Sequence, residues 1–296
     1  MNILITGCNG QLGNEMQTLQ GNYPQHRFFN TDIQDSCPSV NNYYRLDITD
    51  ADAVCDFVND NNIDGIVNCA AYTAVDKAES DRELCSLLNT VAPTYLAEAI
   101  ENRNGWYIHV STDYVFDGKA STPYTEDEPT NPTGVYGDTK LAGEIAVMAA
   151  CEKTMIIRTA WLYSEYGKNF VKTMLMLGKT EPELGVVFDQ VGTPTYALDL
   201  AKAIFAAIEK DVPQGIFHFT NEGVTSWYDF TKAIHRIAGI TTCNVKPLHT
   251  AEYPTPASRP AYSVLDKTKI KQTLDIEIPH WEESLVECVD NLRKNN

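Results

Sequence analysis

Three glycines directly after the first predicted strand constrain the fold of this chain more than any other feature. Met1-Asn-Ile-Leu-Ile-Thr-Gly7 is typical of a short buried parallel strand, and Gly7-Cys-Asn-Gly10-Gln-Leu-Gly13 follows it at once. Glycines at this spacing let the backbone turn tightly from a strand into a helix whose N-terminal amides can receive a pyrophosphate. The pattern therefore predicts a dinucleotide-binding βα unit. Within the turn, Cys8 is interpreted as a small lining residue rather than a nucleophile.

An acidic residue lies at the position where a dinucleotide-binding unit needs one, at the end of the second predicted strand. Asp32 closes the second predicted strand, Arg27-Phe-Phe-Asn-Thr-Asp32. A carboxylate about 20 residues beyond the glycines typically binds the ribose 2′-hydroxyl. No Lys or Arg follows closely, as a 2′-phosphate would require, so we expect that NADH is at least accepted. The competing interpretation is a surface aspartate at a strand end.

Strand-like runs alternate with helical patterns along the chain, which predicts a parallel sheet covered on both faces. The predicted strands are 2–6, 27–31, 43–46, 64–69, 106–111, 154–158 and 215–220, and the helical patterns are 50–61, 80–102 and 133–151. Ser80-Asp-Arg-Glu83 predicts a capping box for the second helix. The expected fold is α/β, a Rossmann-type doubly wound parallel sheet with a smaller C-terminal α/β substrate lobe. We assign 1–160 with 190–222 to the NAD(P)-binding domain and 161–189 with 223–296 to the substrate domain.

The chain contains two Tyr-x-x-x-Lys patterns, and their contexts differ. Tyr136 and Lys140 open a helix that follows the strand ending at Ser111 and a turn-rich segment. Residues four apart share one helix face, and open α/β sheets bind ligands where parallel strands end. We therefore expect these two side chains to converge with a strand-end hydroxyl. Tyr228 and Lys232 lie on an amphipathic helix ending in glycine. We interpret these two residues as a packing side chain and as part of the solvated helix face.

Composition limits the classes of partner. The 296 residues suffice for one large nucleotide domain with a smaller lobe. Forty acidic against 23 basic side chains give a net charge of −17. General binding to nucleic acid or to anionic membranes is therefore disfavoured, and an anionic substrate needs a local positive pocket.

The cysteines and the start of the chain indicate a reducing compartment. The eight cysteines form no Cys-x-x-Cys pattern and no cluster with histidine. We expect neither a zinc site nor a disulfide framework. The sequence starts directly in a strand, without a basic leader, and no apolar run approaches the roughly 18 residues of a membrane helix. We expect a cytoplasmic protein.

With these residues placed, the chain resembles the extended short-chain dehydrogenase/reductases, and within them the dTDP-4-dehydrorhamnose reductase family. The resemblance spans essentially the whole chain. Its most specific parts are Ala-Val-Asp-Lys-Ala-Glu, ending at Glu79, and Ser-Thr-Asp-Tyr-Val-Phe, starting at Ser111. The blocks that carry it are 3–13, 67–79, 111–118, 135–144, 158–163, 189–195 and 259–266.

The resemblance implies reduction of a 4-keto-6-deoxy sugar attached to dTDP, which completes dTDP-L-rhamnose for polysaccharide assembly. It implies Thr112, Tyr136 and Lys140 as the catalytic residues. Tyr136 would donate a proton to the developing oxyanion, with its pKa lowered by the Lys140 ammonium and by the oxidised nicotinamide. Lys140 would also hold the cofactor ribose, and Thr112 would orient the carbonyl group.

The resemblance also implies residues that bind the two small molecules. For Trp161 the competing interpretation is core packing, and for Arg259 it is a loop anchor. The implied cofactor residues are Gly7, Gly10, Gln11, Leu12, Gly13, Asp32, Asp47, Ile48, Ala70 and Ala71, with Tyr136 and Lys140. The implied substrate residues are Thr73, Val75, Thr112, Asp113, Trp161 and Arg259.

Metal binding and self-association stay open. Some members of the family bind Mg²⁺ through glutamates at a dimer contact. Glu15 occupies the first of these positions, but its partner glutamates have no match in this chain. A homodimer is therefore also open.

Four different functions compete with the reductase. A 4,6-dehydratase of similar fold typically follows its catalytic Thr with Asp-Glu, whereas Asp113-Tyr114 follows Thr112 in this chain. The remaining three are a different nucleotide-sugar 4-ketoreductase, a 4-epimerase with tightly bound NAD, and a non-catalytic regulatory subunit of methionine adenosyltransferase. Turnover of the cofactor with a keto-sugar separates a reductase from an epimerase, which consumes none.

Overall fold

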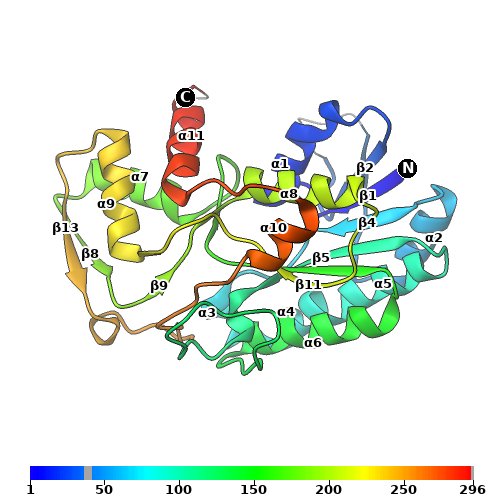
Figure 1. The fold of residues 1–296 in the computed structure, drawn as a ribbon, viewed down its shortest axis with the longest axis horizontal. Coiled ribbons are helices and arrows are strands. Elements are labelled where there is room, and N and C mark those ends of the chain that lie inside the picture. The colour runs from blue at the N-terminus through cyan, green and yellow to red at the C-terminus, as the bar shows by residue number, and fades with distance from the viewer. Residues whose placement is uncertain (37–41, 295–296) are drawn as a thin grey trace.

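A seven-stranded parallel sheet forms the centre of the molecule in the computed structural model, which describes residues 1–36 and 42–294 (Figure 1). Its strand order is β3-β2-β1-β4-β5-β6-β11, and every pairing is parallel. The order reverses between β1 and β4, which is the switch point of a doubly wound sheet. All seven predicted strands are confirmed: β1 (Asn2–Thr6), β2 (Arg27–Asp32), β3 (Tyr43–Arg45), β4 (Gly65–Asn68), β5 (Trp106–Thr112), β6 (Thr154–Thr159) and β11 (Gly215–His218).

Helices cover both faces of this sheet (Figure 1). Ile3 and Ile5 of β1 pack on one side, and Leu4 packs on the other. All three are fully buried, which explains why the strand reads as an uninterrupted apolar run. The first side is covered by α1 (Gln11–Leu19), α8 (Ala197–Glu209) and α10 (Thr268–Leu274), and the second by α2 (Ala51–Asp60), α5 (Ala92–Glu101) and α6 (Val135–Ala150).

The predicted helix over 80–102 is not one regular helix. It consists of α4 (Arg82–Ser86), a π-helical turn at Leu87–Val91 and then α5. The predicted capping box is wrong, because Asp81 is the N-cap residue and the Ser80 hydroxyl donates instead to the Lys77 carbonyl at 3.1 Å. A short helix, α3 (Val75–Ala78), ends just before Ser80, and its last carbonyls compete for that hydroxyl.

A second, smaller group of elements packs beside the C-terminal edges of the strands. It has its own apolar core, which includes Val171, Phe230 and Trp281. The boundaries between the NAD(P)-binding domain and the substrate domain stay a prediction. The elements are α7 (Phe170–Thr180), α9 (Trp227–Ala238) and α11 (Trp281–Lys294), with the strand pairs β8 (Glu183–Val187) and β13 (Asn244–Leu248), β7 (Leu162–Tyr163) and β10 (Thr195–Tyr196), and β9 (Val191–Gly192) and β12 (Thr225–Ser226). Short 3₁₀ turns lie at Gln20–Asn22, Asp113–Val115 and Thr250–Glu252.

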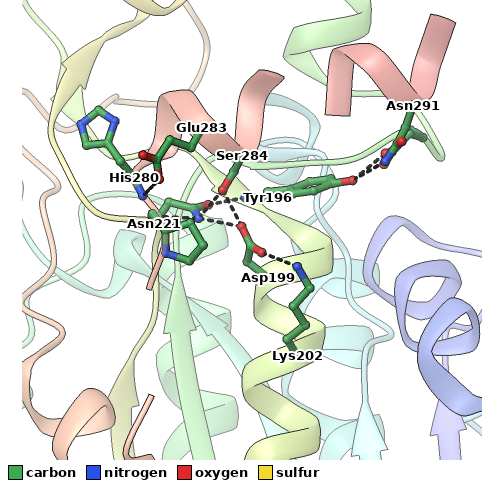
Figure 2. A network of polar contacts seen from close by, with 10 residues as sticks. Tyr196, Asp199, Lys202, Asn221, His280, Glu283, Ser284 and Asn291 are labelled. Atoms are coloured by element: carbon green, nitrogen blue, oxygen red, sulfur yellow. Dashed lines mark hydrogen bonds and ion pairs between the residues drawn. The ribbon is translucent and has the colours of Figure 1, made fainter. Parts of the chain in front are cut away.

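A buried polar network fixes α11 to the sheet domain (Figure 2). The Asp199 carboxylate accepts hydrogen bonds from Ser284 Oγ at 2.6 Å, Asn221 Nδ2 at 2.8 Å and Lys202 Nζ at 3.0 Å. Asn221 Oδ1 accepts in turn from the Tyr196 amide at 2.7 Å. Since buried polar groups must be paired, this network orients the C-terminal helix on α8.

The second Tyr-x-x-x-Lys pattern lies on α9, in the smaller group of elements rather than in the seven-stranded sheet domain. Tyr228 is partly buried against the small core and Lys232 is exposed, as predicted. The helix ends at Gly239, whose φ of 72° is the left-handed conformation of a C-terminal cap. In the described part of the chain, no helix is both long enough and apolar enough to span a bilayer.

Candidate active site

The glycine turn is shaped by backbone contacts that exclude side chains. Gly7 has a φ of +64°, and a Cβ there would lie 2.7 Å from the Ala70 amide nitrogen. A Cβ at Gly13 would lie 2.3 Å from the Gly7 carbonyl oxygen. Gly10 is the N-cap of α1 and provides no side-chain cap, so the first amides of this helix remain available to an anion. Cys8 is fully buried in the core beneath the turn, as expected of a small lining residue.

Asp32 lies beside this turn. Its Oδ2 accepts a hydrogen bond from the Asn9 amide at 3.1 Å, which fixes the carboxylate at the end of β2. Asp47 Oδ1 accepts from the amide and the hydroxyl of Thr49, at 2.9 and 2.7 Å, and closes the turn before α2. Ala70 and Ala71 follow β4 and are partly exposed.

Three other residues assigned to the cofactor have structural contacts. The side chains of Leu12 and Ile48 are buried in the two cores of the sheet domain. Gln11 links α1 to the smaller lobe, because its Nε2 donates to the Leu162 carbonyl at 3.4 Å and its Oε1 accepts from Asn169 Nδ2 at 2.9 Å. Any contact that Leu12 or Ile48 makes with a cofactor is therefore left to the backbone.

Thr112 and Tyr136 meet at the end of β5. Thr112 Oγ donates to Asp113 Oδ1 at 3.0 Å and accepts from the Tyr114 amide at 3.3 Å. Tyr136 is the second residue of α6, and its phenol shares a side-chain hydrogen bond with Thr112. Lys140 lies one turn further along α6, is 2% exposed, and donates from Nζ to the Val110 carbonyl at 2.7 Å. Thr112 and Tyr136 are thus neighbours, and Lys140 is bonded to β5 two residues before Thr112, while the convergence of all three groups stays a prediction.

Burial dominates the electrostatics of these groups. It raises the pKa of Tyr136, and the hydrogen bond with Thr112 only partly opposes this rise. Burial lowers the pKa of Lys140 to about 8 and raises the pKa of Asp113 to about 6. Desolvation of the phenolate is the largest cause, and Lys140 is not among the groups that lower this pKa. The lowering expected from Lys140 together with the oxidised nicotinamide stays a prediction for the cofactor complex. A neutral phenol suits a group that must start the reaction protonated.

Of the other residues assigned to the substrate, Asp113 contacts Thr112, and Trp161 and Arg259 have different partners. Trp161 has a left-handed backbone with φ of 49°, and its ring stacks on Trp227 with centroids 3.5 Å apart, leaving the residue partly exposed. Arg259 is 21% exposed. Its Nη2 contacts Asp76 at 2.6 Å, and its Nη1 donates to the Tyr114 hydroxyl at 2.9 Å.

Thr73 and Val75 lie at the start of α3, next to Asp76. Thr73 is exposed and Val75 is partly buried. The ion pair between Arg259 and Asp76 therefore brings Arg259 to the start of α3, where Thr73 and Val75 lie.

Comparison with known proteins identifies the family. The model of the family described as RmlD substrate binding domain matches residues 1–294. A curated dTDP-4-dehydrorhamnose reductase of Aggregatibacter actinomycetemcomitans is 41% identical over 293 residues, covering 96% of each chain. The chain belongs to the RmlD family.

Solved structures of RmlD relatives share the complete fold. A dTDP-4-dehydrorhamnose reductase of Clostridium acetobutylicum is 46% identical, with a TM-score of 0.92 over 99% of this chain and 100% of that one. One from Bacillus anthracis, solved in complex with NADP, is 36% identical, with a TM-score of 0.87 over 98% and 99% of the two chains. The described fold is therefore that of the RmlD family throughout its length.

Glu15, the residue compared with metal-binding members of the family, is buried beside another carboxylate. Glu15 on α1 is 2% exposed, and burial together with a hydrogen bond to Glu165 raises its pKa to about 9. Across 1–36 and 42–294, no three His, Cys, Asp or Glu side chains are arranged to hold a metal ion. Mg²⁺ binding at Glu15 therefore stays open.

Among the residues that the structure describes, six cysteines away from the glycine turn are free thiols: Cys55, Cys69, Cys85, Cys151, Cys243 and Cys288. Cys37 lies outside the described residues.

Sequence reasoning missed three residues of the site. Asp76 and Tyr114 bind Arg259, and His109 lies against Lys140. Asp76 and Tyr114 both lie inside the blocks that carry the family resemblance. Their position in these blocks is the sequence signal that could have identified them as site residues. Their partner is 183 and 145 residues away in the sequence, and only the folded chain shows the contact.

Proposed function

We propose that this chain reduces the C4 keto group of dTDP-4-dehydro-L-rhamnose to give dTDP-L-rhamnose, with NADPH or NADH as the reductant. The observation that carries this proposal is the contact of Tyr136 with Thr112 at the end of β5, with Lys140 bonded to Val110 of the same strand. The switch-point sheet that holds them also carries the glycine turn. Relatives that share the whole chain length are named as dTDP-4-dehydrorhamnose reductases.

In this proposal the glycine turn and the first amides of α1 hold the pyrophosphate, and Asp32 binds the ribose. The bound cofactor supplies the hydride for the C4 carbon. Thr112 orients the carbonyl oxygen, and the protonated phenol of Tyr136 donates its proton to the oxyanion that develops there. Lys140 lies on the same helix as Tyr136, one turn further along, and holds the nicotinamide ribose.

The substrate side of the proposal uses the Arg259 guanidinium for the diphosphate. In a chain of net charge −17 the overall field repels a nucleotide diphosphate, so binding depends on a few close charge-assisted hydrogen bonds. Hydrogen bonds to Asp76 and Tyr114 hold the Arg259 side chain in place. Its guanidinium group can therefore bind the diphosphate without a large loss of side-chain entropy.

Arg259→Ala is expected to raise the Michaelis constant for the dTDP-sugar and to leave cofactor affinity unchanged. Loss of a hydrogen bond to a charged group costs about 1.5–3 kcal/mol, or roughly tenfold or more in affinity. Steady-state kinetics with varied sugar, and NADH titration by fluorescence, measure the two effects. An unchanged Michaelis constant in a folded variant would place Arg259 outside the substrate site and make it a loop anchor.

Asp32→Ala is expected to weaken NADH more than NADPH. The Asp32 carboxylate pairs with the ribose hydroxyl of NADH and repels the 2′-phosphate of NADPH. Its removal therefore takes a hydrogen bond from NADH and removes a repulsion from NADPH. Dissociation constants for both cofactors, measured on the same protein, give the ratio. Equal losses for NADH and NADPH would mean that Asp32 only supports the Asn9 amide and the turn.

The direct test is oxidation of NADH and of NADPH in the presence of dTDP-4-dehydro-L-rhamnose. A dehydratase or an epimerase would consume no net cofactor, and a regulatory subunit of methionine adenosyltransferase would co-purify with its catalytic subunit without turnover. Thr112 is followed by Asp113-Tyr114, which does not favour dehydration. Mg²⁺ is not part of the proposal, and a homodimer and a cytoplasmic location stay predictions.

A further inference from the structure

Two tryptophan rings stack where the smaller lobe meets the carboxyl ends of the sheet strands. Trp161 and Trp227 have ring centroids 3.5 Å apart and planes 10° from parallel. Trp161 comes two residues after the end of β6, and Thr159 at this end pairs in register with Thr112. Trp227 is the first residue of α9. The stack therefore joins a strand end of the candidate site to the lobe.

The backbone of Trp161 is in a conformation that a bulky residue rarely adopts. Its φ is 49°, in the left-handed region. Such strain persists only where the surrounding structure holds the residue, and it is found mostly at binding and catalytic sites. The Trp161 carbonyl accepts a hydrogen bond from the Thr195 amide at 3.2 Å, which fixes the backbone next to the strained residue. The direction of the indole is therefore imposed by its neighbours.

Gly192 of β9 leaves the space in which the Trp161 ring lies. A Cβ at Gly192 would lie 2.8 Å from Trp161 Cε2 and 2.9 Å from Cζ2. These distances are shorter than van der Waals contact between carbon atoms, so a side chain there would displace the ring. β9 pairs with β12, whose Ser226 caps α9 by accepting from the Asp229 amide at 3.0 Å. One strand pair thus holds the glycine and leads into Trp227.

The surroundings of Gly192 connect the Trp161 ring to the candidate site. The same Cβ position is 2.8 Å from Ser263 Oγ, so the Ser263 hydroxyl and the Trp161 ring both lie against this glycine. Burial raises the pKa of Asp113, and hydrogen bonds with Ser263 and Thr112 oppose this rise. Asp113 Oδ1 accepts from Thr112 Oγ at 3.0 Å. These contacts place Trp161 beside the residues that surround Thr112.

The lobe supports Trp227 from behind. The ring of Phe170, the first residue of α7, lies 4.5 Å from that of Trp227 between centroids. Both rings pack on the apolar core of the lobe, where α7 and α9 lie side by side (Figure 1). Trp161 itself stays partly exposed. A partly exposed ring that is stacked on a fixed one loses little freedom when a ligand packs on it.

We propose that Trp227 is a positioning residue that holds the Trp161 indole as a fixed wall of the sugar-binding part of the site. The lobe would then set how the keto-sugar lies over Thr112 and Tyr136. An indole suits this task, because it offers apolar area to the C–H groups of a sugar and an N–H donor to its hydroxyls. The catalytic part of this inference rests on the proposed function, but the position of the Trp161 ring does not.

The ring position can be measured without activity by ¹⁹F NMR of protein labelled with 5-fluorotryptophan, because the chain has only four tryptophans. We expect one narrow Trp161 signal in the unmodified protein and in Trp227→Phe, which keeps a stacked ring. Trp227→Leu should broaden or split this signal, and Trp227→Met serves the same purpose if the leucine variant does not fold. Trp281→Phe, in the lobe core against Phe230, is the matched control and should leave the signal narrow. One narrow Trp161 signal without a ring at position 227 would overturn the proposal.

Kinetics with dTDP-4-dehydro-L-rhamnose test whether Trp227 acts through Trp161. Small displacements of a positioning surface have large effects on rate, so Trp227→Leu should lower kcat/KM for the sugar about tenfold or more. Affinities for NADH and for dTDP alone should not change, and Trp227→Phe should restore most of the loss. In a Trp161→Leu background the change at Trp227 should add little, because the interaction is already lost.

Two kinetic results would overturn the proposal. Additive losses from Trp161→Leu and Trp227→Leu would make Trp227 a structural residue of the lobe. An equal weakening of dTDP alone would place the Trp161 wall at the nucleotide rather than at the sugar. A broadened Trp161 signal in Trp227→Leu, with no sugar reduction by the unmodified protein, would keep the inference about the ring position and count against the proposed function.

Discussion

Tyr136→Phe is expected to lower the turnover number by about 10²–10⁴-fold, the usual contribution of general acid catalysis. The variant lacks only the phenolic oxygen, and the edge-to-face contact of this ring with Tyr114, at 5.5 Å between centroids, is retained. Cofactor affinity should therefore change little. Single-turnover kinetics with bound NADH, combined with a cofactor titration, measure the two quantities separately.

Tyr228→Phe is the matched control, because it removes a phenol from the other Tyr-x-x-x-Lys pattern. Tyr228 packs on the small core of the lobe and lies on α9, whereas Tyr136 contacts Thr112 at the end of β5. Its turnover should equal that of the unmodified protein. Similar losses at the two tyrosines would show that Tyr136 does not hold the transferred proton.

Glu144→Ala is expected to lower the free energy of unfolding by about 3–5 kcal/mol, the usual cost of leaving a buried charge without its partner. Glu144 is 1% exposed and Arg158 is 2% exposed. Arg158 donates from Nε at 2.9 Å to Oε1 and from Nη2 at 2.7 Å to Oε2, which ties α6 to β6. Without the carboxylate, the guanidinium would remain buried against Phe116. Urea denaturation at neutral pH measures the loss.

Asp290→Ala is the control for this second prediction. It breaks the pair between Arg293 and Asp290, whose side chains are about half exposed. Exposed pairs of this kind contribute about 0–1 kcal/mol. If the losses at Glu144 and Asp290 were equal, the buried pair would not be what holds α6, and with it Tyr136 and Lys140, against the sheet.

The strands of the sheet could be predicted because their signal is local. A strand buried on both faces, such as Asn2–Thr6, needs a short apolar run, and that run is visible in the sequence. Ser80 shows the limit of local reasoning. Its pattern fits a capping box, but the preceding helix α3 offers the hydroxyl a nearer carbonyl.

The sequence predicts which residues form the candidate site, but it does not predict their burial or their electrostatic state. Motif and spacing place Tyr136 and Lys140 on one helix face, and the structure adds their burial, which raises the pKa of Tyr136. The contacts of Arg259 with Asp76 and of Lys140 with His109 join segments that are far apart in the sequence. No local sequence pattern therefore predicts them.

Transfer of deuterium from C4-deuterated NADH to dTDP-4-dehydro-L-rhamnose tests the central claim most directly. The proposed function predicts dTDP-L-rhamnose with deuterium at C4 of the sugar, formed in equal amount to the cofactor oxidised, and seen by NMR of the isolated product. Product without deuterium, or sugar conversion without net oxidation of NADH or NADPH, would contradict the assignment of this chain as a ketoreductase.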